Sequence, residues 1–371
     1  MATTRYVGTG GNDASDGLTW ATRKLTLNGV ENTPVAAGDT VYVGAGTYRE
    51  QLICDVDGSS GSPITYIGDF TGEHTDGVGG EVRITASNDD STYESIHGVV
   101  ANKNYRTFEG FTIEVSPELA GYYKFGLVST NASNLIVRKC VFYWGFGGID
   151  VIYSDTTPRT HLIENCVFIG GHYGTRIRAV GGNIDNDLST VQNCLFLGQR
   201  YGGFSIVIDY VGGVSINNST FMFCDNAVGM SGHALTAGQH VTVKNSLFTL
   251  INNAALSGVA SYTADITEDY NNFCFCYTMR SNVDAGANST TAYHILDTRW
   301  AHKMMQGGKL LTPFDHAYYS RLVDVAGSSP TTTDIRGTAV QGAERELGAL
   351  EYNSDLSIDI GVSRSRLLGG V

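Results

Sequence analysis

The sequence lacks the features that define several large classes of protein. It has no run of about 18 apolar residues, so no transmembrane helix is expected. The segment from Met1 to Tyr6 has neither the basic start nor the apolar core of a secretory signal. A net charge of −13 excludes the basic surface of a nucleic-acid-binding shell. We therefore expect no nucleic-acid partner and no membrane insertion.

Proline and charged residues are also scarce, at 6 residues and 16% of the chain, whereas the 46 glycines suit many tight turns. Residues 134–275 show no convincing helical periodicity of apolar residues, which disfavours ankyrin and tetratricopeptide repeats. The seven cysteines have no zinc-site spacing, and two acidic loops near the N-terminus fall short of a calcium ligand set. We expect no metal and no cofactor.

The sequence does contain one six-residue motif, which we call the phrase, repeated along residues 134–275. The first copies read Val137-Arg-Lys-Cys-Val-Phe142 and Ile163-Glu-Asn-Cys-Val-Phe168. A period near 26 residues, about one turn of a solenoid, means that each unit buries its apolar face against the next. Each copy ends in a phenylalanine, and the sixth copy matches the pattern less well. The phenylalanines are Phe142, Phe168, Phe196, Phe221, Phe248 and Phe275.

Alternation of apolar and polar residues within each copy predicts a strand. Because valine and phenylalanine then lie on opposite faces, the copy must bend within its length or be buried on both sides. Leucine-rich repeats need more leucines per turn, so a parallel β-helix is the remaining solution. Stacked columns of small or polar residues are expected, with Cys140, Cys166 and Cys194 as buried thiols. The asparagine column comprises Asn165, Asn193, Asn218, Asn245 and Asn272.

Both ends of the chain resemble known sequences. The segments at 6–17 and 37–50, with a candidate helix at 19–31 between them, resemble the entry of right-handed parallel β-helix proteins of the pectate-lyase-like superfamily. Residues 320–352 resemble the closing signature of the same proteins. The resemblance implies an all-β fold: a right-handed parallel β-helix solenoid with a short N-terminal capping helix and an irregular C-terminal cap.

We expect one domain over residues 1–352, because a solenoid of this length counts as one domain. Its parts are an N-terminal cap at about 1–38, coils at about 39–290 and a C-terminal cap at about 291–352. Residues 353–371 lie outside the resemblance, and we interpret them as a tail or arm that contacts a neighbouring subunit.

Polar side chains gather on the strand that follows the phrase in three successive turns. Alignment of these strands predicts that Asp150, Arg176, Arg178, Ser205 and Asp209 face outward. Four residues are predicted to flank them: Tyr153, His172, Arg200 and Tyr210.

Three interpretations of this groove stay open. In a hydrolase, Asp150 and Asp209 are the catalytic acid and base, about 10 Å apart across two turns. In a lyase, Arg176 or Arg178 binds or deprotonates an acidic sugar. The residues predicted to bind the glycan are Arg178, His172, Tyr153 and Tyr210. The third interpretation is a ladder of Asp–Arg pairs on a solvent face, each worth at most about 1 kcal/mol.

Catalytic signatures give little support to an enzyme. Arg176-Ile177-Arg178 resembles the Arg-Ile-Lys of polygalacturonases, but the paired aspartates and Gly-His-Gly that should precede it are missing. No pectate-lyase signature is present either. The sequence leaves activity open and favours a protein without it, because this scaffold carries lyases, hydrolases and binding proteins alike.

The first functional hypothesis is a non-catalytic virion or extracellular surface protein. It would resemble the β-helix trunks of bacteriophage tailspikes or decorate a particle. Its expected partners are a host cell-surface polysaccharide and virion proteins, in a homo-oligomer for which a trimer is favoured. The alternatives are a polysaccharide depolymerase on the same scaffold and a rigid spacer without ligand. Exposed aromatic rows along the groove favour glycan binding, and a smooth polar wall favours the spacer.

Overall fold

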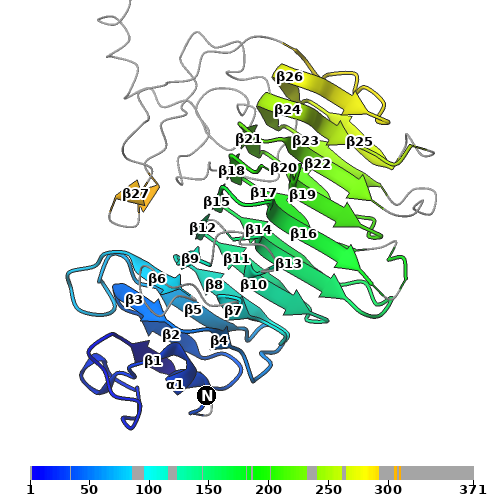
Figure 1. Ribbon diagram of the computed structural model, residues 1–371. Helices are drawn as coiled ribbons and strands as arrows, with labels where there is room; N and C mark the ends of the chain where they lie inside the picture. The colour runs from blue at the N-terminus through cyan, green and yellow to red at the C-terminus, as the bar shows by residue number, and fades with distance from the viewer. Residues whose placement is uncertain are drawn as a thin grey trace, which may run out of the picture.

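The structure is a computed structural model in which strands stack in parallel along one axis (Figure 1). It describes residues 2–33, 35–85, 96–115, 123–143, 145–180, 182–184, 187–200, 202–231, 240–260 and 265–291, with the strand pairs 305–306 and 309–310. In this part of the chain, helix occurs at Trp20–Thr22 and in α1 (Leu27–Glu31), within the segment predicted to be helical. No described helix is long and apolar enough to cross a membrane.

One sheet has ten parallel strands, one from each successive turn of the chain. The strands are β1 (Thr4–Val7), β2 (Thr40–Val43), β5 (Ile64–Gly68), β8 (Arg106–Glu109), β11 (Leu135–Arg138), β14 (His161–Glu164), β17 (Thr190–Gln192), β20 (Ser215–Asn217), β23 (Val241–Lys244) and β25 (Ile266–Asp269).

A second sheet of sixteen strands consists of two columns that the long strand β24 joins. The first column is β3 (Gly46–Arg49), β6 (Val82–Thr85), β9 (Thr112–Glu114), β12 (Val141–Tyr143), β15 (Val167–Ile169), β18 (Leu195–Leu197), β21 (Thr220–Met222) and β24 (Leu247–Ser257), with β26 (Asn272–Ser281) paired to β24. The second column is β4 (Leu52–Ile53), β7 (Val99–Val100), β10 (Phe125–Thr130), β13 (Gly147–Tyr153), β16 (Tyr173–Ala179), β19 (Phe204–Asp209) and β22 (Asn226–Ser231).

Each turn therefore runs through one strand of the ten-stranded sheet, one of the first column and one of the second. The strands β11, β12 and β13 make one such turn, and β14, β15 and β16 make the next, paired in parallel strand on strand. This is the parallel β-helix that the repeat predicted. A separate antiparallel pair, β27 (Met305–Gln306) and β28 (Lys309–Leu310), follows later in the chain. Apart from this pair, the predicted C-terminal cap from residue 292 and the tail at 353–371 lie outside the described residues.

The repeated phrase bends at its third residue. That residue has a positive φ in every copy, from 49° to 54°, and so adopts the left-handed conformation that asparagine tolerates best among residues with a side chain. The corner residues are Lys139, Asn165, Asn193, Asn218, Asn245 and Tyr270. After the corner, Cys140, Cys166 and Cys194 are free and fully buried, as predicted, and burial raises the pKa of the first two thiols.

The phenylalanines form a continuous stack inside the coil, with neighbouring ring centroids 4.7–5.0 Å apart and interplanar angles of 2–9°. The stack contains Phe142, Phe168, Phe196, Phe221, Phe248 and Phe273.

The sixth copy is therefore shifted by two residues from the prediction. Phe273, not Phe275, pairs with Phe248, and Phe275 is 62% exposed. Asn272 accordingly leaves the asparagine column, and Tyr270 occupies the corner. The side chain of Asn271 fixes this register, because its amide nitrogen donates to the Val243 carbonyl at 2.8 Å and its oxygen accepts from the Ser246 N–H at 2.8 Å.

A buried ion pair ties the N-terminal helix to the coil. Glu31, the last residue of α1, accepts two hydrogen bonds from Arg106 of β8, at 2.6 and 3.1 Å. The hydroxyl of Tyr66 donates to the same carboxylate at 2.7 Å, and Arg106 also donates to the carbonyl of Val56. Both charged side chains are almost fully buried, so the pair holds α1 against β5 and β8.

Candidate functional site

The predicted polar residues meet on the outward face of β13, β16 and β19. Asp150 lies beside Arg176 in the register of β13 and β16, and Arg178 lies beside Asp209 in that of β16 and β19. The alignment of the repeats therefore placed these four side chains on one face and on adjacent turns.

The ion pairs between them run diagonally rather than straight across. Arg176 donates to Asp209 Oδ2 from Nε at 3.0 Å and from Nη2 at 2.8 Å. Arg178 donates to the two oxygens of Asp150 at 3.1 and 3.0 Å. The hydroxyl of Ser231 donates to Asp209 as well. Each carboxylate is thus held by a guanidinium two residues away from its own register partner, after it for Asp150 and before it for Asp209, which cross-braces three turns.

The two guanidinium groups keep part of their hydrogen-bonding capacity for a ligand. The carboxylates of Asp150 and Asp209 are buried, whereas the side chains of Arg176 and Arg178 are 27% and 26% exposed. A guanidinium has five N–H donors, of which each arginine uses two here. The remaining three on each arginine make no hydrogen bond to a described residue, and hydroxyl or carboxylate oxygens of a ligand are suitable acceptors.

The same pairing disfavours acid–base catalysis by the two carboxylates. Both oxygens of Asp150 and the Oδ2 atom of Asp209 already accept hydrogen bonds from the two arginines, so protein donors occupy them. The α-carbons of Asp150 and Asp209 are also far apart. Two turns separate them by about 9.6 Å along the axis and two residues by about 6.6 Å along the strand, so the distance between them is about 12 Å.

An aromatic row runs next to the ion pairs. Phe125 of β10 and Tyr173 of β16 lie on either side of Gly147 in the strand register, with ring centroids 6.5 Å apart and planes 7° apart. A side chain at Gly147 would collide with the Phe125 ring, since an added Cβ would lie 2.2 Å from it. The guanidinium of Arg176 lies 5.5 Å from the centroid of the Tyr173 ring, which joins the aromatic row to the ion pairs.

Residues from the turns preceding β10, β13 and β16 widen this row into what we call the aromatic cluster: Tyr123, Phe125, Phe146, His172 and Tyr173. His172 stacks on Phe146 with centroids 5.0 Å apart, and Tyr123 meets Phe146 edge to face at 4.7 Å. Tyr123 is the most open member, at 64% exposure. Phe125 and Phe146 are buried in this cluster, whereas Tyr123, His172 and Tyr173 keep part of their surface exposed beside the arginines.

Two further residues that sequence reasoning missed, His97 and Lys124, lie at the start of β10. Burial is the main cause that lowers the pKa of His97, the charge of Lys124 lowers it further, and the charge of Asp150 partly opposes both. Nδ1 of His97 accepts the N–H of Phe125 at 3.1 Å. Both residues belong to a turn before the first regular copy, so alignment of the copies gave no signal for them.

Two predicted members of the groove lie inside the coil instead. Ser205 is buried and its hydroxyl donates to Gln199 at 3.1 Å. Residues do not alternate strictly between the two faces here, because the strand bends. An added Cβ on Gly148 would touch the core ring of Phe168, and the next residue, Ile149, also lies in the core. Two successive residues therefore face inward.

Tyr153 is the second wrong placement. It is fully buried, and its hydroxyl donates to Asp187 Oδ2 at 2.7 Å. Two other flanking residues, Tyr210 and Arg200, are exposed at turns, Tyr210 directly after Asp209. His172 is a member of the aromatic cluster. The predicted catalytic and glycan-binding roles of these residues stay predictions.

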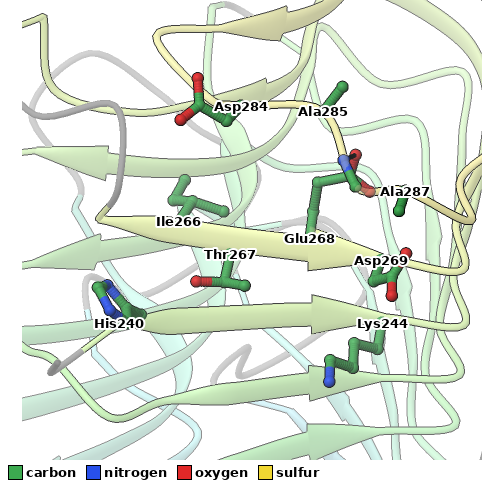
Figure 2. A pocket seen from close by; sticks show the side chains of 10 residues that line it. His240, Lys244, Ile266, Thr267, Glu268, Asp269, Asp284, Ala285 and Ala287 are labelled. Carbon is green, nitrogen blue, oxygen red and sulfur yellow. Dashed lines mark hydrogen bonds between the residues drawn. The ribbon is translucent and has the colours of Figure 1, made fainter.

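A second candidate is a cavity of about 360 Å³ at the last strand of the ten-stranded sheet (Figure 2). Lys244 and Asp269 are register partners on β23 and β25, and the loop with Asp284 overhangs them. Burial opposes ionisation of Asp269, but hydrogen bonds from Asn288 outweigh it and lower the pKa of this carboxyl.

The wall of this cavity is rigid and of mixed charge. Glu268 is buried at its base, where it accepts from Arg280 and from Gly286 N, both at 2.7 Å, and from Ser289 at 2.5 Å. Among the described residues, no group of three or more His, Cys, Asp or Glu side chains is arranged to hold a metal ion. The cavity lies where the repeat period degrades, which is why the sequence gave no signal for it.

Comparisons with known proteins agree with this architecture. A family model described as a right-handed beta helix region matches residues 97–274. A solved rhamnogalacturonan lyase is similar over 96% of this chain and 98% of its own, with a TM-score of 0.59 and 14% identity. A pectate lyase is similar over 95% and 98%, with a TM-score of 0.54 and 15% identity. No curated protein sequence matches the chain.

The fold is therefore a right-handed parallel β-helix, as predicted. Identities of 14–15% show the fold alone. The similar structures include enzymes that act on polysaccharides, whereas the expected likeness to bacteriophage tailspikes stays a prediction.

Proposed function

We propose that the protein binds a polysaccharide along the outward face of β10, β13, β16 and β19. The observation that carries the proposal is the aromatic cluster beside the open guanidinium edges of Arg176 and Arg178. Sugar rings pack their apolar faces on aromatic rings, and their oxygens accept hydrogen bonds from arginine. Because the rungs repeat at about 4.8 Å, the face offers an extended chain similar contacts on successive turns.

The local charge of this face suits neutral or acidic sugars, although the whole chain has a net charge of −13. Asp150 and Asp209 are balanced by Arg176 and Arg178, and Lys124 adds a positive charge nearby. The face is therefore locally neutral to basic. A uronate or another acidic sugar would find donors there rather than repulsion.

Binding without cleavage is the primary proposal, because oxygens of both Asp150 and Asp209 already accept hydrogen bonds from Arg176 and Arg178. A polysaccharide lyase is the second candidate. It is favoured by the partly exposed arginines, which can neutralise a uronate, and by the two similar lyase structures.

The first test is calorimetric titration with a panel of bacterial, algal and plant polysaccharides. For a ligand found in this way, Tyr173→Ala removes the central ring and is expected to weaken binding about tenfold. Arg176→Lys keeps the charge opposite Asp209 but loses the planar fork, and a loss of similar size is expected. The matched control is Tyr277→Ala, because Tyr277 is an exposed tyrosine on β26, three strands beyond β19 in the sheet.

The same samples separate binding from cleavage. New absorbance near 235 nm would establish the lyase, and new reducing ends that disappear in Asp209→Asn would establish a hydrolase. Binding without either product supports the primary proposal. Equal losses of affinity in Tyr173→Ala and Tyr277→Ala would exclude the face as the binding site.

We also propose that the protein works extracellularly or on a virion, where it meets host glycans, and that it assembles as a homo-oligomer, with a trimer favoured. The support is the low share of charged residues, 16%, and residues 353–371, which extend beyond the part that resembles known β-helix proteins. Light scattering at micromolar concentration tests this assembly, and a monomer would contradict it.

A further inference from the structure

The cavity at the end of the ten-stranded sheet contains two charged side chains of opposite sign. Lys244 lies on β23, and Asp284 lies on the loop on the opposite side of the cavity (Figure 2). Both side chains are exposed, and neither takes part in a salt bridge or a side-chain hydrogen bond within the described part of the chain. All ten residues that line the cavity belong to that part. A ligand therefore finds one positive and one negative group here.

The carboxylate beside Lys244 leaves the lysine free. Asp269 is the register partner of Lys244 on β25, but the two side chains form no ion pair. Asp269 instead accepts the N–H groups of Tyr270 and Asn288, at 3.0 and 2.9 Å, and the side-chain amide of Asn288 at 3.0 Å. The three N–H donors of the Lys244 ammonium are therefore available to a ligand.

The loop that carries Asp284 is fixed before any ligand binds. Gly286 donates its N–H to the carboxylate of Glu268 at 2.7 Å, and the hydroxyl of Ser289 donates to the same carboxylate at 2.5 Å. Glu268 is buried and paired with Arg280. An added Cβ on Gly286 would lie 2.1 Å from the carbonyl oxygen of Glu268, so only glycine lets the loop approach β25 this closely. Binding therefore costs little ordering of this wall.

The floor of the cavity is long and polar. From His240 to Lys244 it follows four residue steps along β23, about 13 Å. Thr267 on β25 is exposed in the middle of the floor, and its hydroxyl can both donate to and accept from an amide. The volume of about 360 Å³ is in the range of small-molecule sites.

We propose that this cavity binds a short peptide of about three residues with a free amino end and a free carboxyl end. The ammonium pairs with Asp284 and the carboxylate with Lys244. An extended peptide of three residues spans at most about 11 Å, which fits the length of the floor. A single amino acid carries its two charges too close together to pair with groups on opposite sides of the cavity (Figure 2).

NMR titration of the full chain with three peptides tests the proposal. Triglycine carries both charges, N-acetyl-triglycine only the carboxylate, and triglycine amide only the ammonium. An exposed ion pair changes affinity by up to about fivefold, so triglycine is expected to bind about five times more tightly than either blocked peptide. Equal affinities of the three peptides would overturn the proposal. Glycine binding as tightly as triglycine, or no binding of triglycine at millimolar concentration, would overturn it as well.

Two variants that each remove one charge assign the two ends of the peptide. Lys244→Met is expected to weaken triglycine binding about fivefold and to leave triglycine amide unaffected, because the amide has no carboxylate. Asp284→Asn is expected to weaken triglycine binding equally and to leave N-acetyl-triglycine unaffected. Both side chains are exposed, so the fold is retained, which circular dichroism checks.

The matched control is Lys139→Met, which removes the charge of another exposed lysine, and no change in triglycine binding is expected. The same loss in Lys139→Met and Lys244→Met would indicate a general effect of charge and would overturn the proposal. Tyr173→Ala, on the proposed polysaccharide face, should leave triglycine binding unchanged. The outcome for the cavity is therefore independent of the outcome for that face.

Discussion

Replacing Glu31 by alanine is expected to lower the free energy of unfolding by about 3–5 kcal/mol. Glu31 and Arg106 are both almost fully buried, with Arg106 donating two hydrogen bonds to the carboxylate and Tyr66 a third. Removal of the carboxylate leaves the guanidinium charged and without its counter-charge inside the protein. Urea denaturation followed by circular dichroism measures the loss.

The matched control is Arg138→Ala, which breaks an ion pair with Glu109 on the outside of the ten-stranded sheet. Arg138 is 39% exposed, and Lys139 continues to pair with Glu109 at 2.6 Å. The expected loss is below about 1 kcal/mol. Losses of the same size in Glu31→Ala and Arg138→Ala would mean that the buried pair does not hold the N-terminal end together.

Replacing Phe221 by alanine is expected to cost about 3–5 kcal/mol, the largest effect foreseen for a single apolar residue. Its ring lies between Phe196 and Phe248 with centroids 4.9 and 4.8 Å away, so truncation opens a cavity in the middle of the stack. Thermal or urea unfolding of the variant tests this value.

Phe275→Ala is the comparison that distinguishes the observed register from the one predicted by the repeat. Phe275 is 62% exposed, and its replacement should change the free energy of unfolding by no more than about 0.5 kcal/mol. A large loss for Phe275→Ala, with little change for Phe273→Ala, would contradict the register shown by the structure.

The architecture could be predicted from the sequence because the coil repeats one local pattern. The phrase ending in Phe142 contains a strand, a corner and a second strand, and the corner carries asparagine where a left-handed conformation is required. We predicted that the phrase either bends or is buried on both faces, and the structure shows both. The phrase bends at Lys139, and Val141 and Phe142 on its opposite faces are buried.

The sixth copy could not be placed because two registers satisfy its pattern. Tyr270-Asn-Asn-Phe-Cys-Phe275 has a phenylalanine at both candidate positions of the stack. The choice depends on hydrogen bonds from Asn271 to the preceding turn, which are contacts between residues about 25 positions apart. Such contacts leave no local signal.

The candidate site was predictable to the extent that it follows the strand register. Asp150, Arg176, Arg178 and Asp209 share one face because their strands align. The diagonal pairing between them depends on side-chain reach, and Ser205 faces inward because the strand bends before it. The aromatic cluster was missed as a unit, because members such as Tyr123 and Phe146 come from turns of unequal length.

The most direct test of the central claim is a crystal structure with an oligosaccharide of the polysaccharide that the calorimetric panel identifies. The account predicts sugar density across β10, β13, β16 and β19, with a ring on the aromatic cluster and oxygens within about 3 Å of Arg176 and Arg178. Sugar density confined to the cavity beside Lys244 and Asp269, with the aromatic face empty, would contradict it.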